Sequence, residues 1–200
     1  MRKIVVPGEI ISDRPLRMEG SIIEDGKTCS TVMGVFDDEK GTLISLEGLW
    51  YPRPGEKVIG IIDEAKLNTY TVNLQAPYKG IIISKYTEDI MANGDIVEAI
   101  VKDVDKTGMA VLARARRLGG GKVVYIKPSK IPRILGKGNT MINQISDATK
   151  SSIEVGMNGL IWVKGGRIDL VLEALVKIQE EAHISGLTER VGSMLKEKTQ

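Results

Sequence analysis

The sequence predicts a mainly β chain whose carboxy-terminal part is α+β, built from three small modules. Short β-branched runs between turn residues fill the first part of the chain, a pattern typical of small sheets and barrels. Apolar residues at helical spacing appear only after residue 122, beyond a run of glycines. With 200 residues and 42% apolar side chains, the chain can bury a core in each module. We expect the modules at residues 1–54, 55–118 and 122–200.

The first module is predicted to be a small β-rich unit. Turns rich in glycine, aspartate and proline separate its expected strands, at residues 4–6, 28–36 and 42–46. Pro52, Pro54 and Gly55 mark its end.

The second module contains five expected strands and no long helix, at residues 58–63, 69–74, 78–84, 96–104 and 109–113. In the second of these, Tyr70, Val72 and Leu74 fall on one face, and polar residues fall on the other. Five short strands of this kind predict a closed or nearly closed barrel. The glycines that follow Leu118 predict a slack linker to the third module.

The third module mixes strands with helices. Asn158-Gly159 between two apolar runs is a strong hairpin signal. The expected order is strand 123–126, short helix 128–135, glycine loop 136–139, helix 140–150, hairpin strands 152–157 and 160–164, amphipathic helix 167–182, and a last helix 187–198.

Several classes of protein are disfavoured by composition. One cysteine (Cys29) and one histidine (His183) give neither an intrachain disulfide nor a Cys/His zinc site. The chain has no run of 18 apolar residues and no signal peptide, so we expect a cytoplasmic protein without a membrane segment. Acidic pairs such as Asp37-Asp38 lie in turns and are expected to be solvated. With no nucleophile motif either, we expect no catalytic residues, metal or cofactor.

Positive charge is concentrated in one part of the chain. The totals are 28 basic and 26 acidic residues, a net charge of +2. Residues 102–150 contain 11 basic and 3 acidic side chains, whereas every other part has a slight acidic surplus. This segment, with Arg114, Arg116 and Arg117 at its centre, is the expected footprint of a phosphate backbone. Only 4% of residues are aromatic, which favours backbone contacts over base stacking.

Two segments resemble known RNA-binding modules. Residues 131–145, with the loop Gly136-Lys137-Gly138-Asn139, resemble a KH domain of the type I order β-α-α-β-β-α, followed here by an extra helix. Residues 55–62, 78–80 and 94–101 resemble the OB-fold barrel first described in ribosomal protein S-one. Together with residues 5–9, 46–55 and 156–163, they resemble one family, the RNA-binding cap subunit of the archaeal exosome.

That resemblance implies a non-catalytic subunit that captures single-stranded RNA. Three copies would sit on a hexameric ring of RNase PH-like exosome subunits and guide RNA 3′ ends into it for 3′-to-5′ phosphorolysis and tailing. The isolated chain could be a monomer. Two alternatives stay open: a transcription or translation factor that binds RNA through the same modules, and a purely structural assembly subunit.

Two departures from the family pattern stand out. The last position of the KH loop is Asn139 instead of glycine, although asparagine tolerates a left-handed backbone. The positions at which such barrels usually carry stacking aromatics fall near Thr71 and Ile83. Tyr70 and Tyr78 are the available substitutes.

The candidate residues form two sets. Leu49, Trp50, Tyr51 and Pro52 are an apolar run at a module boundary, interpreted either as domain packing or as a partner surface. The candidate RNA-binding residues are Lys66, Tyr70, Tyr78, Lys102, Lys106, Arg114, Arg116, Arg117, Lys122, Lys130, Arg133, Gly136, Lys137, Gly138 and Asn139.

Overall fold

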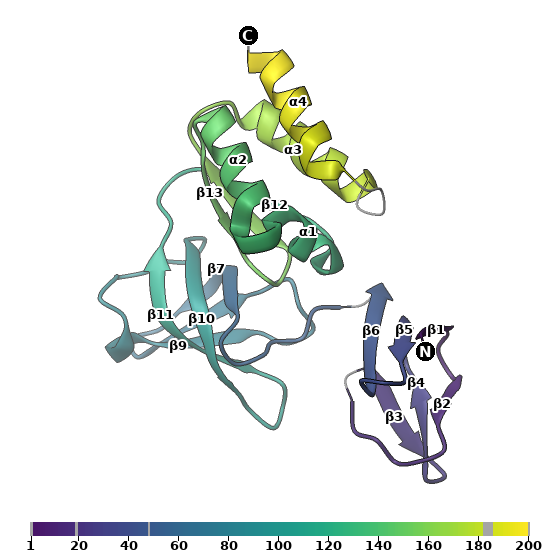
Figure 1. Cartoon of the computed structure of the whole chain (residues 1–200). Coiled ribbons are helices and arrows are strands. Elements are labelled where there is room, and N and C mark those ends of the chain that lie inside the picture. Colours follow the sequence, from purple (N-terminus) through teal and green to yellow (C-terminus); the bar gives the residue numbers. More distant parts are fainter. Residues whose placement is uncertain (1, 19, 48, 182–185, 200) are drawn as a thin grey trace. The chain divides into compact units, whose positions relative to one another are not determined.

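A computed structural model of the chain describes residues 2–18, 20–47, 49–181 and 186–199 (Figure 1). Contacts divide the chain into two units, Met1–Leu49 and Trp50–Gln200. The single histidine, His183, lies outside the described residues. Within the described residues, no helix combines the length and the apolar character needed to cross a membrane.

The amino-terminal unit consists of two three-stranded antiparallel sheets. One has the order β1 (Arg2–Val5), β5 (Met33–Asp37), β6 (Thr42–Glu47), and the other β2 (Ile10–Ser12), β4 (Lys27–Ser30), β3 (Ser21–Glu24). The single strand expected at 28–36 is two strands, because the Ser30 hydroxyl donates to the Val32 carbonyl (2.6 Å) and turns the chain. Asp37, expected to be solvated, is buried, and its carboxylate accepts the Lys40 N–H.

The second unit begins with a closed five-stranded barrel. Its strands are β7 (Lys57–Ala65), β8 (Thr69–Asn73), β9 (Gly80–Ile83), β10 (Ile96–Val104) and β11 (Ala110–Arg117), with a short helix η1 (Ser84–Tyr86) after β9. They are joined in the order β10-β11-β9-β8-β7, and β10 pairs with β7 to close the barrel. Only β9 and β11 are parallel. Trp50 packs in the barrel core, so this unit starts before the boundary expected at residue 54.

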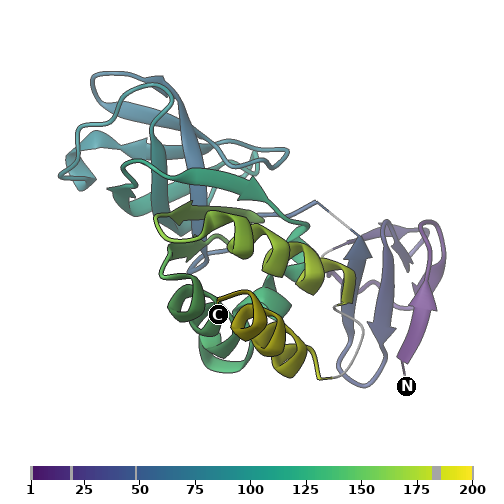
Figure 2. The ribbon, with the colours of Figure 1, turned by 90° about the horizontal axis from the view of Figure 1, so that it is seen from above.

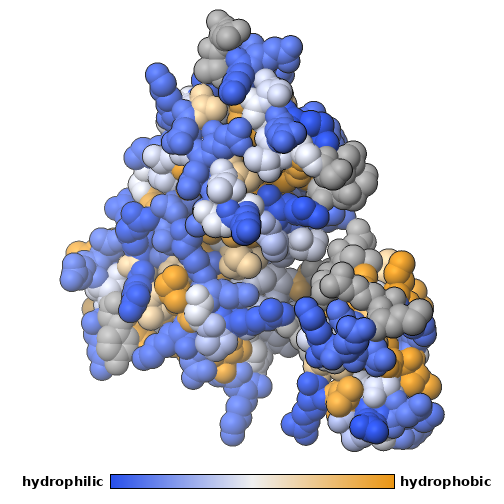
Figure 3. All heavy atoms as spheres, in the orientation of Figure 1, coloured by the Kyte–Doolittle hydropathy of each residue, from blue (hydrophilic) through white to orange (hydrophobic). Residues whose placement is uncertain are grey.

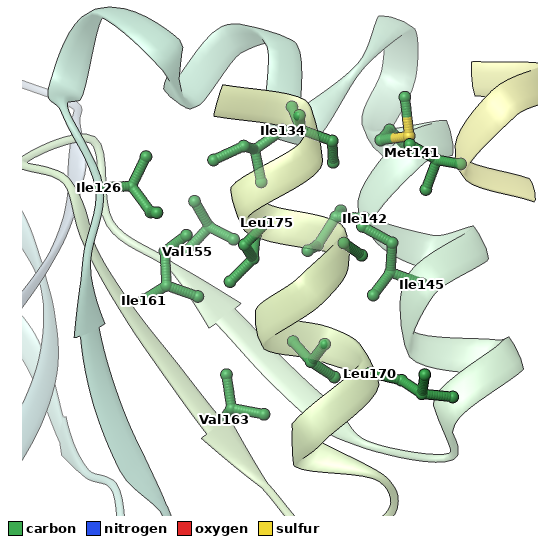
Figure 4. Close-up of a cluster of buried hydrophobic side chains, with 14 of the residues drawn as sticks. Ile126, Ile134, Met141, Ile142, Ile145, Val155, Ile161, Val163, Leu170 and Leu175 are labelled. Carbon is green, nitrogen blue, oxygen red and sulfur yellow. The ribbon is translucent and has the colours of Figure 1, made fainter. Parts of the chain in front are cut away.

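A KH domain with an extra carboxy-terminal helix follows. Its sheet has the antiparallel order β12-β14-β13, and one face carries the helices. Figure 4 shows side chains of the sheet, such as Ile161 and Val163, meeting helix residues such as Ile145 and Leu175. The elements are β12 (Lys122–Tyr125), η2 (Pro128–Lys130), α1 (Ile131–Leu135), η3 (Lys137–Asn139), α2 (Thr140–Thr149), β13 (Ser152–Val155), β14 (Leu160–Lys164), α3 (Ile168–Glu181) and α4 (Leu187–Thr199).

The barrel covers the other face of the KH sheet. Ile59 and Leu118 of the barrel form a buried cluster with Leu160 and Trp162 of β14. Figure 2 shows the helices on one side of this sheet and the barrel on the other. The glycine linker is not slack as expected, because the Trp162 indole N–H and the Lys164 ammonium donate to the Gly120 and Gly119 carbonyls (both 2.7 Å).

Candidate nucleic-acid interface

The outer face of the barrel has no aromatic side chain on β8 or β9. Thr71 pairs with Ile81, and Thr69 with Ile83, and all four are half-buried on the outside of the sheet. Tyr70 is only 8% exposed and belongs to the barrel core, so its proposed stacking role is wrong. The alternation of Tyr70 with Val72 was the sequence signal for this inward position, since side chains two apart share a face.

Two lysines of the barrel have carboxylate partners. The Lys79 ammonium, which was not among the predicted site residues, lies 2.8 Å from an oxygen of Asp63 in β7, and Lys79 directly precedes β9. Hydrogen bonding to Asp63 raises the pKa of Lys79. Lys66, a predicted RNA contact, likewise lies 3.0 Å from Glu64. These two lysines therefore already have anionic partners in the absence of RNA.

The three arginines of β11 have different environments. A bulge in the β10–β11 pairing leaves Arg114 in a left-handed conformation, with φ of 52°. The next residue, Ala115, packs against the barrel core, so the bulge turns Arg114 outward at a position that the simple alternation would point inward. Arg117 lies 3.1 Å from Asp95. Arg114 alone of the three is exposed without an ion pair among the described residues.

Arg116 belongs to a four-residue ion network between the barrel and the KH domain. Its guanidinium lies 2.7 Å from Glu98 of β10 and 3.1 Å from Glu154 of β13. Lys57 of β7 contacts the same two carboxylates, at 3.6 and 2.6 Å. Glu98 raises the pKa of Arg116. Arg116 therefore already has two anionic partners, one in each module, and its contact with RNA stays a prediction.

Burial and ion pairing act in opposite directions on Glu154. Burial raises the pKa of its carboxyl, but Lys57, followed by Arg116, outweighs this and keeps the pKa below its usual value. Glu154 lies 97 residues from Lys57, and nothing in the sequence marks the two as partners.

Asn158 joins the KH domain to the barrel through uncharged hydrogen bonds at the same junction. Its side chain is fully buried, and its amide N–H groups donate to the carbonyls of Ile59 (2.7 Å) and Leu74 (2.8 Å). In return, the Ile59 N–H donates to the Asn158 oxygen (3.2 Å). The asparagine of the predicted hairpin thus pairs three backbone groups of the barrel that would otherwise be buried without partners.

The KH loop contains the left-handed turn expected from its sequence. Gly138 and Asn139 both adopt left-handed conformations, with φ of 62° and 64°. The prediction that asparagine supports this turn is thereby confirmed. Lys137 and Arg133 are exposed, Lys130 is half-exposed, and no ion pair holds them among the described residues. The loop leads directly into α2, whose first backbone N–H groups favour an anion.

A groove of about 270 Å³ lies beside this loop. Its walls come from α1, the loop, α2 and β13, and its lining includes Leu135, Asn139 and Ile142. Lys57 of the barrel also lines it, next to Glu154. The ion network is therefore part of the wall of the KH groove.

Of the remaining predicted residues, Leu49 belongs to the first unit and the others to the second. Lys106 and Lys122 are exposed, and Lys102 is exposed with an interaction of its own. Trp50 and Pro52 are buried, as the domain-packing interpretation expects, and the Trp50 indole donates to Glu56 (2.9 Å). Leu49, Tyr51 and Tyr78 are exposed. The described residues contain no group of three or more His, Cys, Asp or Glu side chains suited to a metal ion.

Known proteins match both the fold and the whole sequence. A family model described as a KH domain matches residues 121–169. Exosome complex component Rrp4 of Pyrococcus furiosus is 35% identical over 223 aligned positions, which cover all of this chain and 84% of that protein. The protein of the same name from Methanobrevibacter smithii is 35% identical, covering 97% and 71%.

A solved structure adds a match in three dimensions. It is described as a candidate exosome complex RNA-binding protein, and it superimposes with a TM-score of 0.67 and 27% identity over 76% of this chain and 97% of that one. These similarities confirm the resemblance drawn from the sequence. The chain belongs to the Rrp4 family of exosome complex components.

Proposed function

We propose that this chain is the RNA-binding cap subunit of an archaeal-type exosome, acting in the cytoplasm without catalytic activity of its own. It captures single-stranded RNA and guides the 3′ end into a hexameric ring of RNase PH-like subunits, which carries out phosphorolytic degradation and tailing. Three copies sit on one ring. The names of the relatives, the description of the solved structure and the KH match support this proposal.

One observation carries the RNA-binding part of the proposal. Two modules of RNA-binding type form one unit, and cations of both remain exposed: Arg114 and Lys106 on the barrel, and Lys137 on the KH loop. Unpartnered cations suit a phosphodiester backbone, because no internal carboxylate competes with the phosphate. Backbone contact of this kind carries little sequence information, so we expect weak sequence preference.

The amino-terminal unit is the proposed contact to the ring. Large apolar side chains are exposed on it, and Figure 3 shows hydrophobic residues on its surface. Such exposure on a small unit is typical of a protein interface. The exposed residues are Ile4, Val6, Ile10, Leu16, Ile22, Ile23, Met33 and Leu49.

The test is a charge-matched pair of triple variants. One carries Arg114→Ala, Lys106→Ala and Lys137→Ala, and the control carries Arg17→Ala, Lys40→Ala and Lys196→Ala, which are also exposed. Binding of a fluorescein-labelled single-stranded RNA of about 15 nucleotides, the upper site size of one OB fold, is followed by anisotropy over a range of salt. Loss of three phosphate contacts makes the slope of log K against log salt less steep by about 2, at roughly 0.7 per phosphate.

The control triple should keep the wild-type slope, because it removes the same charge from other places. Equal slopes for all three proteins would contradict the assignment of these cations. A flat salt response of the wild type would contradict RNA capture altogether and favour a structural subunit. Degradation of the RNA by the isolated chain, with or without phosphate, would contradict the non-catalytic role.

A further inference from the structure

Two exposed tyrosines meet on the barrel, although the sequence assigned them to different surfaces. The ring centroids of Tyr51 and Tyr78 lie 6.5 Å apart, and the ring planes are tilted by 47°. The two side chains are 43% and 41% exposed. This distance is within the range of direct aromatic contact, so the rings form one surface with their outer sides open to solvent.

The Tyr78 ring packs on the turn between β10 and β11. A Cβ on Gly108 would lie 2.8–2.9 Å from three carbons of the Tyr78 ring, so the ring rests directly on this glycine. Gly108 has φ of 88°, which disfavours any other residue. The turn is itself braced, because the Asp105 carboxylate accepts the N–H groups of Thr107 (2.8 Å) and Met109 (3.0 Å).

Tyr51 is held by its neighbours in the chain. Trp50 is buried in the barrel core and hydrogen-bonded to Glu56, and Pro52 on the other side is also buried. The backbone of Tyr51 is therefore anchored at both ends, while its side chain points outward. Both rings are arranged before any ligand arrives, which reduces the entropy lost on binding.

The surroundings favour a nucleobase over a protein side chain. The turn that supports Tyr78 also carries Lys106, which is exposed and has no ion pair among the described residues. The Asp105 Oδ1 atom in that turn accepts three internal hydrogen bonds, since the Thr107 hydroxyl donates to it as well (2.6 Å). Aromatic faces next to a free cation match a base and its phosphate.

The pair also lies next to the strands that form the outer face of the barrel. Tyr78 precedes β9 by two residues, and Gly80 at the start of β9 pairs with Ala110, directly after the Gly108 turn. The outward positions Thr71 and Ile81 offer no ring of their own. We propose that Tyr51 and Tyr78 form a stacking platform for a base of single-stranded RNA, with Lys106 contacting the adjoining phosphate. This inference rests on the proposed RNA-binding function.

The test replaces the rings one at a time in the full-length chain. Tyr51→Leu and Tyr78→Leu keep an apolar side chain but remove the stacking face, and Tyr51→Phe and Tyr78→Phe keep it. Tyr125→Leu is the matched control, because Tyr125 is an exposed tyrosine of the same unit outside the pair. For the labelled RNA described above, each leucine variant should bind about tenfold more weakly, as expected for one lost stacked base. The phenylalanine and Tyr125 variants should stay close to wild type.

Two further measurements separate the explanations. Salt dependence should be unchanged in the leucine variants, because no phosphate contact is lost. Cooperative urea unfolding with the wild-type midpoint should show that the variants are folded. If wild-type protein binds RNA and the leucine variants bind equally well, the platform is refuted while the proposed function stands. If they bind RNA normally but fail to assemble with RNase PH-like subunits, the pair is a protein contact and the inference is again refuted.

Discussion

Arg114 and Arg116 are two residues apart on one strand, yet they belong to different kinds of region. Arg116 lies at the junction of barrel and KH domain, where two cations face two carboxylates. Arg114 lies on the open surface, exposed and without an ion pair among the described residues. The first region uses charge to hold the protein together, and the second leaves charge available to a ligand. The surplus of positive charge in the sequence does not distinguish these uses, because only the folded chain brings the carboxylates to one arginine.

The largest effect is expected at the neutral centre of the junction. Asn158→Ala would leave two carbonyls and one N–H of the barrel buried without partners, at about 1 kcal/mol or more each. We expect a loss of about 3 kcal/mol of unfolding free energy, measured by urea denaturation. Asn143→Ala, at an exposed position of α2, should change it by less than about 0.5 kcal/mol. A loss below about 1 kcal/mol in Asn158→Ala would show that the junction does not depend on this residue.

The charged part of the junction should respond to pH. Because the folded pKa of Glu154 is below its usual value of 4.5, the ionised carboxylate stabilises the folded state above that value, and the contribution disappears as pH falls through the folded pKa. Glu154→Gln should therefore cost about 1 kcal/mol near neutral pH, a partly exposed pair being discounted for screening.

Urea denaturation of the wild type and of Glu154→Gln over a pH series tests the direction of this pH dependence. The difference between wild type and variant should shrink as the pH falls below about 4.5. Asp105, Asp169 and Glu181 also have lowered pKa values, but they titrate in both proteins and cancel in the difference. If the difference in unfolding free energy stayed constant with pH, the ion network would not be its cause.

On the open surface, stability and binding should change in opposite directions. Arg114→Gly relieves a left-handed backbone that glycine adopts freely, so unfolding free energy should rise by about 0.5 kcal/mol. The same change removes an exposed cation, so RNA affinity at low salt should fall about fivefold, and the salt slope should become less steep by about 0.7. Urea denaturation measures the unfolding free energy of this variant, and anisotropy measures its RNA affinity. A variant that is less stable, or that binds RNA as well as wild type, contradicts the contrast drawn between Arg114 and Arg116.

The smallest effect is expected at Lys66. Its ammonium is already next to Glu64, so a phosphate would have to compete with that carboxylate. Lys66→Ala should lower RNA affinity less than twofold and leave unfolding free energy within about 0.5 kcal/mol, as exposed pairs contribute little. An affinity loss as large as that of Arg114→Gly would show that ion pairing in the free protein does not predict which cations bind RNA.

Local pattern was sufficient for most of the architecture. The five barrel strands, the KH elements and the two carboxy-terminal helices lie where alternation, helical spacing and turn residues place them, because each signal is contained within a few neighbouring residues. The left-handed turn at Asn139 follows from the same local chemistry. The inward position of Tyr70 was also present in the alternation, and assigning it a stacking role overlooked that signal.

Contacts between distant segments required the folded chain. These contacts form only when the barrel closes and the KH sheet packs against it. They join Lys57 to Glu154, Asn158 to Ile59, and Tyr51 to Tyr78. The sequence by itself therefore determines a five-stranded barrel, a KH-type order of elements and a concentration of positive charge near both. Which of those charges remain open to RNA is a property of tertiary packing, since an arginine is free or paired according to the carboxylates that other strands bring to it.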